Sequence, residues 1–346
     1  MYVCVYSSAF RHTRFACLCV RIQLHFDTLV SLVCVFSVYY MGIPVIDYTQ
    51  LDSSCDQVME ACETWGFFIL TNVFPPENFV AGIDMCAQLF TVSSFEKAAC
   101  KSGGRKLRGY FSVGDENVEG LIDHYGSYNE GGADHKEGWE FGRPGSNLGS
   151  SRACRLFSGV DNSWPSSFPK FQQFATQYYK EILGVGTRVL TLIEKVSSIP
   201  ILAACDNPTT TLRFLHYWPP PANMPESVGI GAHRDYGLIT LLMVDDCGGL
   251  EILDEDGKWM KVPVISNSII VNIGDMLMLW TNGRFKSNIH RVIHRGTKHR
   301  YSIPFFLEPN MQTVIKTQTG ESFGTCEEIL TSFYIKSGLL KPEMLV

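Results

Sequence analysis

The sequence lacks several patterns that mark particular protein classes. It contains 12 cysteines in 346 residues, but no two are spaced as C-x-x-C, which excludes zinc ribbons and thioredoxin-like redox motifs. No run of Lys and Arg with interleaved aromatic residues is present, and the formal net charge is -6, so we expect no nucleic-acid partner. There is also no internal repeat and no low-complexity linker.

Charged residues are few, at 18%, whereas hydrophobic residues make up 45% of the chain. This balance is typical of a globular protein rather than a disordered or membrane-embedded one. A chain of this length buries roughly three quarters of its unfolded surface, so it needs no disulfide staples. Most cysteines, among them Cys62 and Cys86, lie in apolar runs. We interpret them as reduced, buried residues of a cytoplasmic protein.

Residues 1–40 form an extension that is set apart from the predicted fold. They contain three arginines against one acid and lead into an uncharged stretch over 28–46, which is about long enough to span a bilayer. Gly42 and Pro44 interrupt this stretch, and Met41 stands just before the first predicted strand. We therefore favour a dispensable extension over a targeting segment or a membrane anchor.

Residues 41–200 are predicted to form an N-terminal α/β region. Ile43–Asp47 and Phe67–Val73 have the apolar composition of strands. Ser54 and Gln57 have the spacing of a capping box and are expected to open the helix between these strands. Two further helices are predicted, one beginning at Pro75 and Pro76 and one spanning Pro169–Ser198.

The segment 103–149 has little periodicity and is rich in Gly, Asp, Asn and Tyr. Long irregular segments inside a compact domain are often binding loops or lids. Within this segment, Asp134–Glu137 is a charged stretch that we interpret as a solvated cluster in preference to a direct active-site role. Arg108 is a candidate for the mouth of a substrate site, and Tyr110 is a candidate for the same mouth or for packing.

Residues 201–310 predict a β-rich core, and residues 311–346 predict a helical tail that packs on it. Gly, Asp and Asn punctuate the core, with hairpin turns expected at Asp254–Gly257 and Gly274–Asp275. Short strands at this spacing favour a sandwich or a jelly roll. The eight predicted strands are Thr210–Tyr217, Leu238–Val244, Leu250–Leu253, Trp259–Val262, Ser268–Ile273, Met276–Trp280, Ile289–Ile293 and Tyr301–Leu307, and the tail helix is Cys326–Ser337.

His233 and Asp235 are separated by one residue. On an extended strand, side chains two positions apart point to the same face, so both can reach one cation. The third ligand must come from another strand, where His290 and His294 have the same parity, and the ten-residue step from His290 to Arg300 favours His290. Two imidazoles and one carboxylate leave three positions open, which suits Fe(II) oxygen chemistry.

Arg300 and Ser302 repeat this two-residue spacing on the last predicted strand. Gly296–Lys298 is a predicted turn, so we expect a hairpin that brings Arg300 back beside the strand of His290. An arginine fork with a neighbouring hydroxyl binds a carboxylate well. A metal site with such a clamp predicts an acidic co-substrate that reaches toward the metal.

From about Ile43 to Pro309 the chain resembles the isopenicillin N synthase-like branch of the iron(II)/2-oxoglutarate-dependent dioxygenases. The resemblance implies a mainly β fold with α-helices, in which a distorted double-stranded β-helix (jelly roll) forms the catalytic core and helices flank it. The matching stretches come in the family's order and at about its spacing: Ile43–Asp47, Trp65–Phe68, His233–Asp235, Gly248–Leu250, Val271–Asp275, His290–Val292 and Arg300–Ser302.

The resemblance also implies the roles of the site residues. His233, Asp235 and His290 would bind Fe(II), and Arg300 and Ser302 would hold the distal carboxylate of the co-substrate 2-oxoglutarate.

One position departs from the family. The family has a tyrosine directly before the proline of the strand that precedes the metal ligands, whereas this sequence has Trp218 there. Tyr217 is therefore expected to contact the co-substrate through a one-residue shift.

The activity that the resemblance implies is the hydroxylation or desaturation of a small organic molecule with O2, which releases succinate and CO2. One alternative is an Fe(II) oxidase of the same fold that needs no 2-oxoglutarate, because some relatives use the Arg-x-Ser pair for their own substrate's carboxylate. A zinc hydrolase and a non-catalytic binding module are alternatives from other classes. The pair Arg300 and Ser302 speaks against the hydrolase, and the complete set of ligands speaks against a decayed site.

Overall fold

The computed structural model describes residues 2–4, 18–21, 37–40, 42–102, 107–118, 134–159 and 162–345. Within the N-terminal extension it places three short strands, β1 (Tyr2–Cys4), β2 (Leu18–Arg21) and β3 (Ser37–Tyr40). The other predictions for the extension, and those for 103–106 and 119–133, lie outside the described residues. In the described part of the chain, no helix is long and apolar enough to cross a membrane. The division of the chain after residues 40, 200 and 310 stays a prediction.

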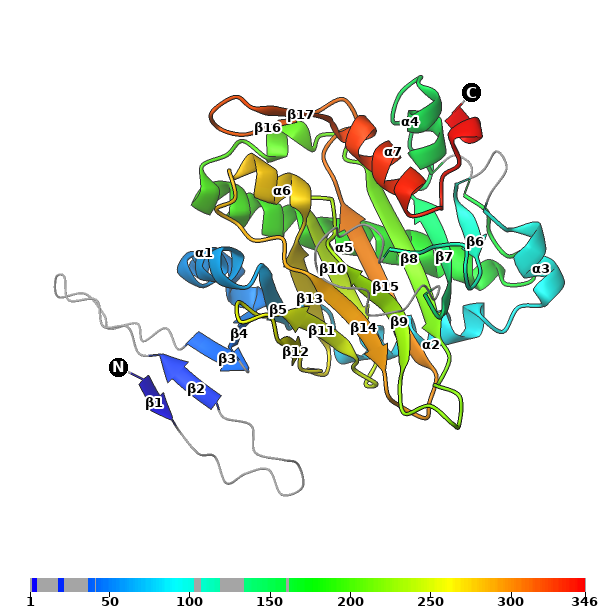
Figure 1. Cartoon of the computed structure of the whole chain (residues 1–346), viewed down its shortest axis with the longest axis horizontal. Helices are drawn as coiled ribbons and strands as arrows, with labels where there is room; N and C mark the ends of the chain where they lie inside the picture. The colour runs from blue at the N-terminus through cyan, green and yellow to red at the C-terminus, as the bar shows by residue number, and fades with distance from the viewer. Residues whose placement is uncertain are drawn as a thin grey trace.

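Two β-sheets form the centre of the fold (Figure 1). In the described residues, the larger sheet has the order β1-β2-β3-β4-β5-β13-β10-β15-β8-β7-β6 and the smaller has the order β12-β11-β14-β9. The further strands of the larger sheet are β4 (Ile43–Asp47), β5 (Phe67–Thr71), β13 (Ser268–Ile273), β10 (Ile239–Val244), β15 (Arg300–Leu307), β8 (Thr210–Tyr217), β7 (Lys136–Gly142) and β6 (Gly109–Phe111). The smaller sheet consists of β12 (Trp259–Lys261), β11 (Leu250–Leu253), β14 (His290–His294) and β9 (Ser227–His233), and a separate ribbon pairs β16 (Val314–Lys316) with β17 (Ser322–Thr325).

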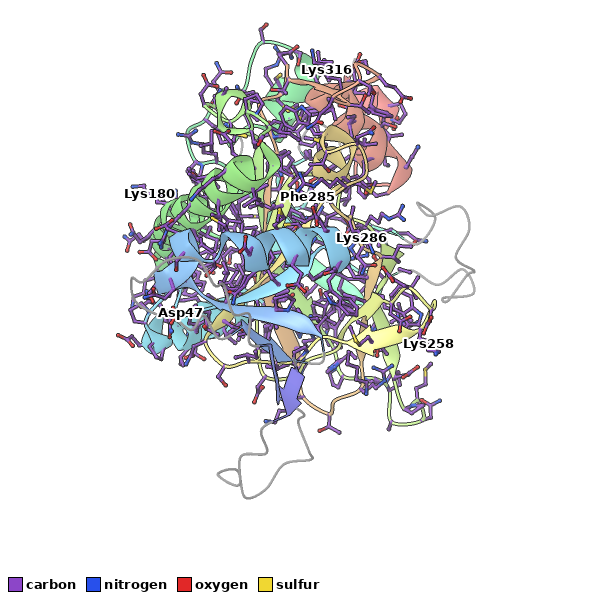
Figure 2. All side chains as sticks on the ribbon, turned by 90° about the vertical axis from the view of Figure 1, so that its left-hand side faces the viewer. Asp47, Lys180, Lys258, Phe285, Lys286 and Lys316 are labelled. Carbon is purple, nitrogen blue, oxygen red and sulfur yellow. The ribbon has the colours of Figure 1, made fainter. Side chains whose placement is uncertain are left out.

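Helices cover the outer face of the larger sheet, where α2 and α5 contact β15. Figure 2 shows Lys180 of α5 and Lys258, in the turn before β12, on opposite sides of the molecule, so the layers run from helices through the larger sheet to the smaller one. The helices are α1 (Cys55–Thr64), α2 (Pro76–Leu89), α3 (Ser94–Ala99), α4 (Arg152–Phe157), α5 (Pro169–Ser197), α6 (Asp275–Trp280) and α7 (Cys326–Lys336), with short 3-10 turns η1 (Tyr48–Ser53), η3 (Leu202–Ala204) and η4 (Pro342–Leu345).

Alternation along the strands separates two hydrophobic cores. On β8, Leu212 and Phe214 belong to the outer core between the larger sheet and the helices. Leu215 and Tyr217 on the same strand belong to the inner core, together with Leu250 of the smaller sheet. Because side chains of a strand alternate between its faces, every second residue of β8 faces the space between the two sheets. This arrangement confirms the predicted jelly roll with flanking helices, although its sheets do not close into a barrel.

The predicted strand Met276–Trp280 is wrong, because these residues form the helix α6. A short apolar run fits a buried helix as well as a strand, and Met and Leu favour a helix. The hairpin turn predicted at Gly274–Asp275 is wrong for the same reason, since Gly274 is the residue that precedes α6. A Cβ at Gly274 would lie 2.3 Å from the carbonyl oxygen of Gly237, so the close approach of two backbones requires glycine there.

The capping box predicted at Ser54 and Gln57 is also wrong. Ser54 does precede α1, but its side chain caps no backbone N–H. The Ser54 hydroxyl instead donates to the carbonyl of Gln50, 3.0 Å away, because the 3-10 turn η1 runs directly into the helix.

The hairpin expected between the strands of His290 and Arg300 does not form. β14 pairs with β11 and β9 in the smaller sheet, whereas β15 pairs with β10 and β8 in the larger one. The connection at Gly296–Lys298 therefore crosses from one sheet to the other. As a result, His290 and Arg300 face each other across the space between the sheets instead of lying on neighbouring strands.

Candidate active site

Three side chains of the types that ligate metals meet where β9 ends and β14 begins. His233 is the last residue of β9 and pairs with His290, the first residue of β14, so their rings lie with centroids 4.3 Å apart. Asp235 follows two residues after His233, beyond the end of the strand, and its Oδ1 is 3.7 Å from Nε2 of each histidine. The structure therefore brings together all three residues that the sequence singled out, although Asp235 is not on the strand as expected.

The remaining polar atoms of these three side chains are held by the protein. Nδ1 of His233 donates to the carbonyl of Gly231 at 2.8 Å, and Nδ1 of His290 donates to the carbonyl of Asn288 at 3.1 Å. Such bonds fix the ring orientation and leave Nε2 free as a ligand atom.

The carboxylate of Asp235 is fixed in the same way. Its Oδ2 accepts hydrogen bonds from Thr240 at 2.5 Å and from Asn272 at 2.8 Å. Oδ1 of Asp235 and the two Nε2 atoms are thereby left to converge on one point.

Burial sets the protonation of these groups. It lowers the pKa of His233 to about 3, helped by the neighbouring His290. Burial alone would raise the pKa of Asp235, but His290, His233 and its two hydrogen bonds outweigh this effect and lower it. A neutral imidazole and an ionised carboxylate are the forms that bind a divalent cation. This donor set fits Fe(II) with positions left open for other ligands.

A cavity between the sheets connects these residues with the predicted carboxylate clamp. It is lined by His233 and His290 at one part and by Arg300, Ser302 and Tyr217 at another. A concave site with mainly apolar walls and a few convergent polar groups is typical of binding sites for small organic molecules.

Arg300 is 1% exposed, and no acidic side chain of the described residues pairs with it. Its Nε donates to the carbonyl of Gly248 at 2.6 Å, its Nη1 lies 3.4 Å from Oγ of Ser302, and its guanidinium stacks over the ring of Tyr217 at 4.6 Å. A buried cation without an acidic partner is costly, so this arrangement fits an anionic ligand.

Tyr217 pairs directly with Arg300 across β8 and β15 and lines the cavity. Its hydroxyl lies 3.5 Å from Oγ of Ser302. Trp218, which occupies the family's tyrosine position, instead packs against the rings of His216 and His135. The alternative third ligand, His294, is bonded through Nε2 to the carbonyl of Lys298 and is not part of the cluster.

The interpretation of Asp134–Glu137 as a solvated cluster is wrong. Asp134, Lys136 and Glu137 are all buried, and Lys136 lines the cavity from β7. The placement of Arg108 at a substrate mouth is also wrong, since Arg108 is fully buried, pairs with Glu140 and does not line the cavity.

The sequence interpretation also missed two charged residues that line the cavity, Glu116 and Arg213. For Lys136 a signal was available, because the alternation of Trp139 and Phe141 with polar residues indicates that its segment, Lys136–Gly142, is a strand.

Comparison with known proteins agrees with this geometry. The sequence model of the 2OG-Fe(II) oxygenase superfamily matches residues 209–309, and the model described as non-haem dioxygenase in morphine synthesis N-terminal matches residues 43–167. The 2-oxoglutarate-Fe(II) type oxidoreductase hxnY of Emericella nidulans is 35% identical over 276 residues, which cover 75% of each chain. The chain belongs to the 2OG-Fe(II) oxygenase superfamily.

Other relatives and solved structures support the same assignment. The 2-oxoglutarate-dependent dioxygenase citB of Monascus ruber is 33% identical over 80% of this chain and 86% of its own. A putative 2OG-Fe(II) oxygenase family protein from Caulobacter crescentus superposes with a TM-score of 0.69 at 27% identity, covering 85% of this chain and 99% of its own. The fold is also that of a full-length Neurospora crassa protein solved in complex with alpha-KG, with a TM-score of 0.71 at 24% identity and coverage of 84% and 95%.

The protein is thus an Fe(II)- and 2-oxoglutarate-dependent dioxygenase that uses O2. Enzymes of this class hydroxylate or desaturate their substrates. The comparisons favour neither the oxidase that dispenses with 2-oxoglutarate nor the zinc hydrolase.

Proposed function

We propose that His233, Asp235 and His290 hold the Fe(II) of this dioxygenase, and that Arg300, with Ser302 and Tyr217, binds the distal carboxylate of 2-oxoglutarate. One observation carries the proposal: Arg300 is a buried cation without an acidic partner in the described residues, and it lines the same cavity as the three ligand residues. An arginine fork binds a carboxylate in two parallel hydrogen bonds.

An Fe(II) ion held by His233, Asp235 and His290 would supply, together with 2-oxoglutarate and O2, the oxidising power for attack on an unactivated C–H bond. The chain's own residues orient the reactants and exclude water. Arg300 orients the co-substrate from one end, and it is itself held by Gly248 and the ring of Tyr217. Phe67 packs edge-on against the ring of His290, with centroids 5.5 Å apart, and keeps water from this side of the cluster.

A small organic molecule is the proposed substrate, because the same cavity between the sheets must also hold 2-oxoglutarate. A solved structure of the Neurospora crassa protein that shares this fold contains thymine, which is a molecule of this size class. A cytoplasmic location is proposed as well. It is supported by the eight cysteines from Cys55 to Cys326, all of which are free thiols.

Anaerobic titration of the enzyme with Fe(II) and then with 2-oxoglutarate tests the site. The native enzyme is expected to develop a visible charge-transfer band, and His233→Ala is expected to lose it together with metal binding. His294→Gln is the matched control, because it keeps a donor for the carbonyl of Lys298 and removes the alternative ligand. A band that survives in His233→Ala, or metal binding without any band in the native enzyme, contradicts the proposal.

A further inference from the structure

Three charged side chains line the cavity without belonging to the proposed iron and 2-oxoglutarate sites. They are Glu116, which follows β6, Lys136 on β7 and Arg213 on β8. Side-chain exposure is 3% for Glu116, 2% for Lys136 and 7% for Arg213. Buried ionised groups need a structural or functional reason, because their desolvation is costly.

Each of these groups is paired with an opposite charge. Nζ of Lys136 lies 2.6 Å from Oδ2 of Asp134 and 2.9 Å from Oε2 of Glu116. Arg213 lies 2.9 Å from Oε1 of Glu116 and 2.7 Å from Oε2 of Glu140.

Arg108 pairs with Glu140 and completes the network. Three acids, Asp134, Glu116 and Glu140, therefore balance three bases, Lys136, Arg213 and Arg108, and the net charge of the network is zero.

The network lies close to the proposed metal site. Oδ1 of Asp134 accepts a hydrogen bond of 2.9 Å from the backbone N–H of Gly231, two residues before His233. Lys136 pairs with Tyr217 across β7 and β8, on the same face of the sheet. The Lys136–Glu116 pair thus lines the same cavity as the proposed iron ligands, so one small molecule could contact both.

The charge balance of the network differs from that at Arg300. Arg300 has no acidic partner in the described residues and so favours an anion, whereas Lys136 and Arg213 are already neutralised. Burial would raise the pKa of Glu116, but Arg213 and Lys136 outweigh it and hold the pKa at about 2. The pairs therefore stay ionised at ordinary pH. A substrate with a net charge would remain uncompensated beside them, which is unfavourable in a buried site.

The Lys136–Glu116 pair still has hydrogen-bonding capacity. The ammonium of Lys136 has three N–H donors, of which Asp134 and Glu116 take two, and each carboxylate oxygen of Glu116 accepts more than one hydrogen bond. A donor and an acceptor thus lie 2.9 Å apart at the cavity wall. The neighbouring wall is apolar and includes Val118, Phe306 and Phe333.

Building on the proposed function, we infer that the substrate is an uncharged, mainly apolar small molecule that carries an adjacent acceptor and donor, as in an amide or lactam, and that Lys136 and Glu116 anchor this group. Lys136 donates to the substrate oxygen, and Glu116 accepts from the substrate N–H. The apolar wall then covers the rest of the molecule.

Three isosteric probes that differ in charge test this inference on the native enzyme loaded with Fe(II) and 2-oxoglutarate without O2. Benzamide is neutral, benzoate is anionic and benzamidine is cationic, and the corresponding naphthalene series extends the apolar part. Calorimetry measures binding independently of any visible band. A neutral probe is expected to bind at least about tenfold more tightly than its charged isosteres. Tighter binding of a charged probe, or binding of no neutral probe, overturns the inference.

Two variants test the role of the network by changing its charge in opposite directions. Lys136→Met leaves a surplus negative charge and is expected to shift the preference toward benzamidine, whereas Glu116→Gln leaves a surplus positive charge and shifts it toward benzoate. Lys97→Met is the matched control. Lys97 pairs with Glu137, which follows Lys136 on β7, but Lys97 does not line the cavity.

A preference that stays the same in both variants, while Fe(II) and 2-oxoglutarate still bind, contradicts the anchoring role. Where a variant fails to fold, the native probe series decides alone. Loss of the charge-transfer band in the native enzyme contradicts the proposed function, whereas a charged preference with the band intact contradicts only this inference.

Discussion

Replacing Arg300 by methionine removes the only proposed charged partner of the distal carboxylate of 2-oxoglutarate while keeping a similar apolar stem. In the structure, Nε of Arg300 is committed to the carbonyl of Gly248, which leaves the two terminal nitrogens for the ligand. Two charge-assisted hydrogen bonds in a site only 1% exposed are worth about 3 kcal/mol or more, since such bonds contribute about 1.5–3 kcal/mol each. We therefore expect Arg300→Met to raise the KM for 2-oxoglutarate by roughly a hundredfold or more.

The effect on the protein itself has the opposite sign. Without a ligand, Arg300 is a buried charge that lacks an acidic partner in the described residues, so its removal is expected to leave the melting temperature unchanged or to raise it. The increase in melting temperature that 2-oxoglutarate gives to the native enzyme should be lost. Arg300→Lys is expected to fall between the two, because it keeps the charge but loses the fork and the stacking on Tyr217.

Succinate production at varied 2-oxoglutarate concentration measures the KM, and thermal unfolding with and without 2-oxoglutarate measures the stabilisation. Arg295→Met is the matched control, because Arg295 pairs with Glu226 and Glu251 and does not line the cavity. A KM in Arg300→Met within about threefold of the native value would refute the reasoning, since that ratio corresponds to less than about 1 kcal/mol.

Three other changes have separable consequences. Asn272→Ala removes a hydrogen bond of 2.8 Å to Asp235, so Fe(II) affinity should fall by about tenfold or more in a metal titration; an unchanged affinity would exclude this orienting role. Gly229→Ala places a Cβ 2.6 Å from the ring of Tyr217, so we expect a higher KM for 2-oxoglutarate with unchanged Fe(II) affinity, whereas a loss of metal would point to wider damage. Burial raises the pKa of Glu308 to about 8, above its ordinary value of 4.5. The native protein should therefore lose stability as pH rises from about 5 to about 8, and Glu308→Gln should lose less in thermal unfolding over the same range; parallel losses would contradict the raised pKa.

Most strands of the larger and smaller sheets were predictable because each is a short apolar or alternating run bounded by turn residues. Asp254–Gly257 is such a boundary, and Gly257 adopts the positive φ of 74° that the turn requires. The error at Met276–Trp280 shows the limit of this signal. Five apolar residues in a row give no periodicity, so the type of element is ambiguous there. The hydrogen bonds that the backbone N–H groups of Asp275 and Met276 donate to the carbonyls of Asp235 and Tyr236 add to the local preference for a helix.

The convergence of His233, Asp235 and His290 was predictable for a reason that does not depend on the strand boundary. His233 and Asp235 needed only to reach one point, and the spacing of one residue achieves this even though β9 ends at His233. The partner of that pair could not be derived from spacing alone, because His290 and His294 share the same parity. The resemblance and the step to Arg300 chose His290, and the pairing of β14 with β9 places His290 opposite His233.

The misinterpretation of Asp134–Glu137 has a different origin. Charged residues in a Gly- and Asp-rich segment are usually solvated, because burial of a charge requires a partner. Lys136 pairs with Glu116, and Glu140 on the same strand pairs with Arg213. These partners are remote in the sequence and become neighbours only when β7 pairs with β6 on one side and with β8 on the other. Local patterning therefore contains no signal for this network.

The buried cations that line the cavity differ in whether an acid of the chain neutralises them, and they therefore favour ligands of different charge. Arg300, which pairs with no acid of the described residues, gains most from a molecule that brings a carboxylate. Lys136 is held by Asp134 and Glu116, so a second anion there would compete with partners that are covalently part of the chain and pre-positioned. A substrate acid would therefore be drawn to the Arg300 end and displace 2-oxoglutarate, whereas a neutral substrate leaves that end to the co-substrate. The charge pattern thus favours simultaneous occupation of the cavity by an anionic co-substrate and a neutral substrate, which is what a reaction between the two requires.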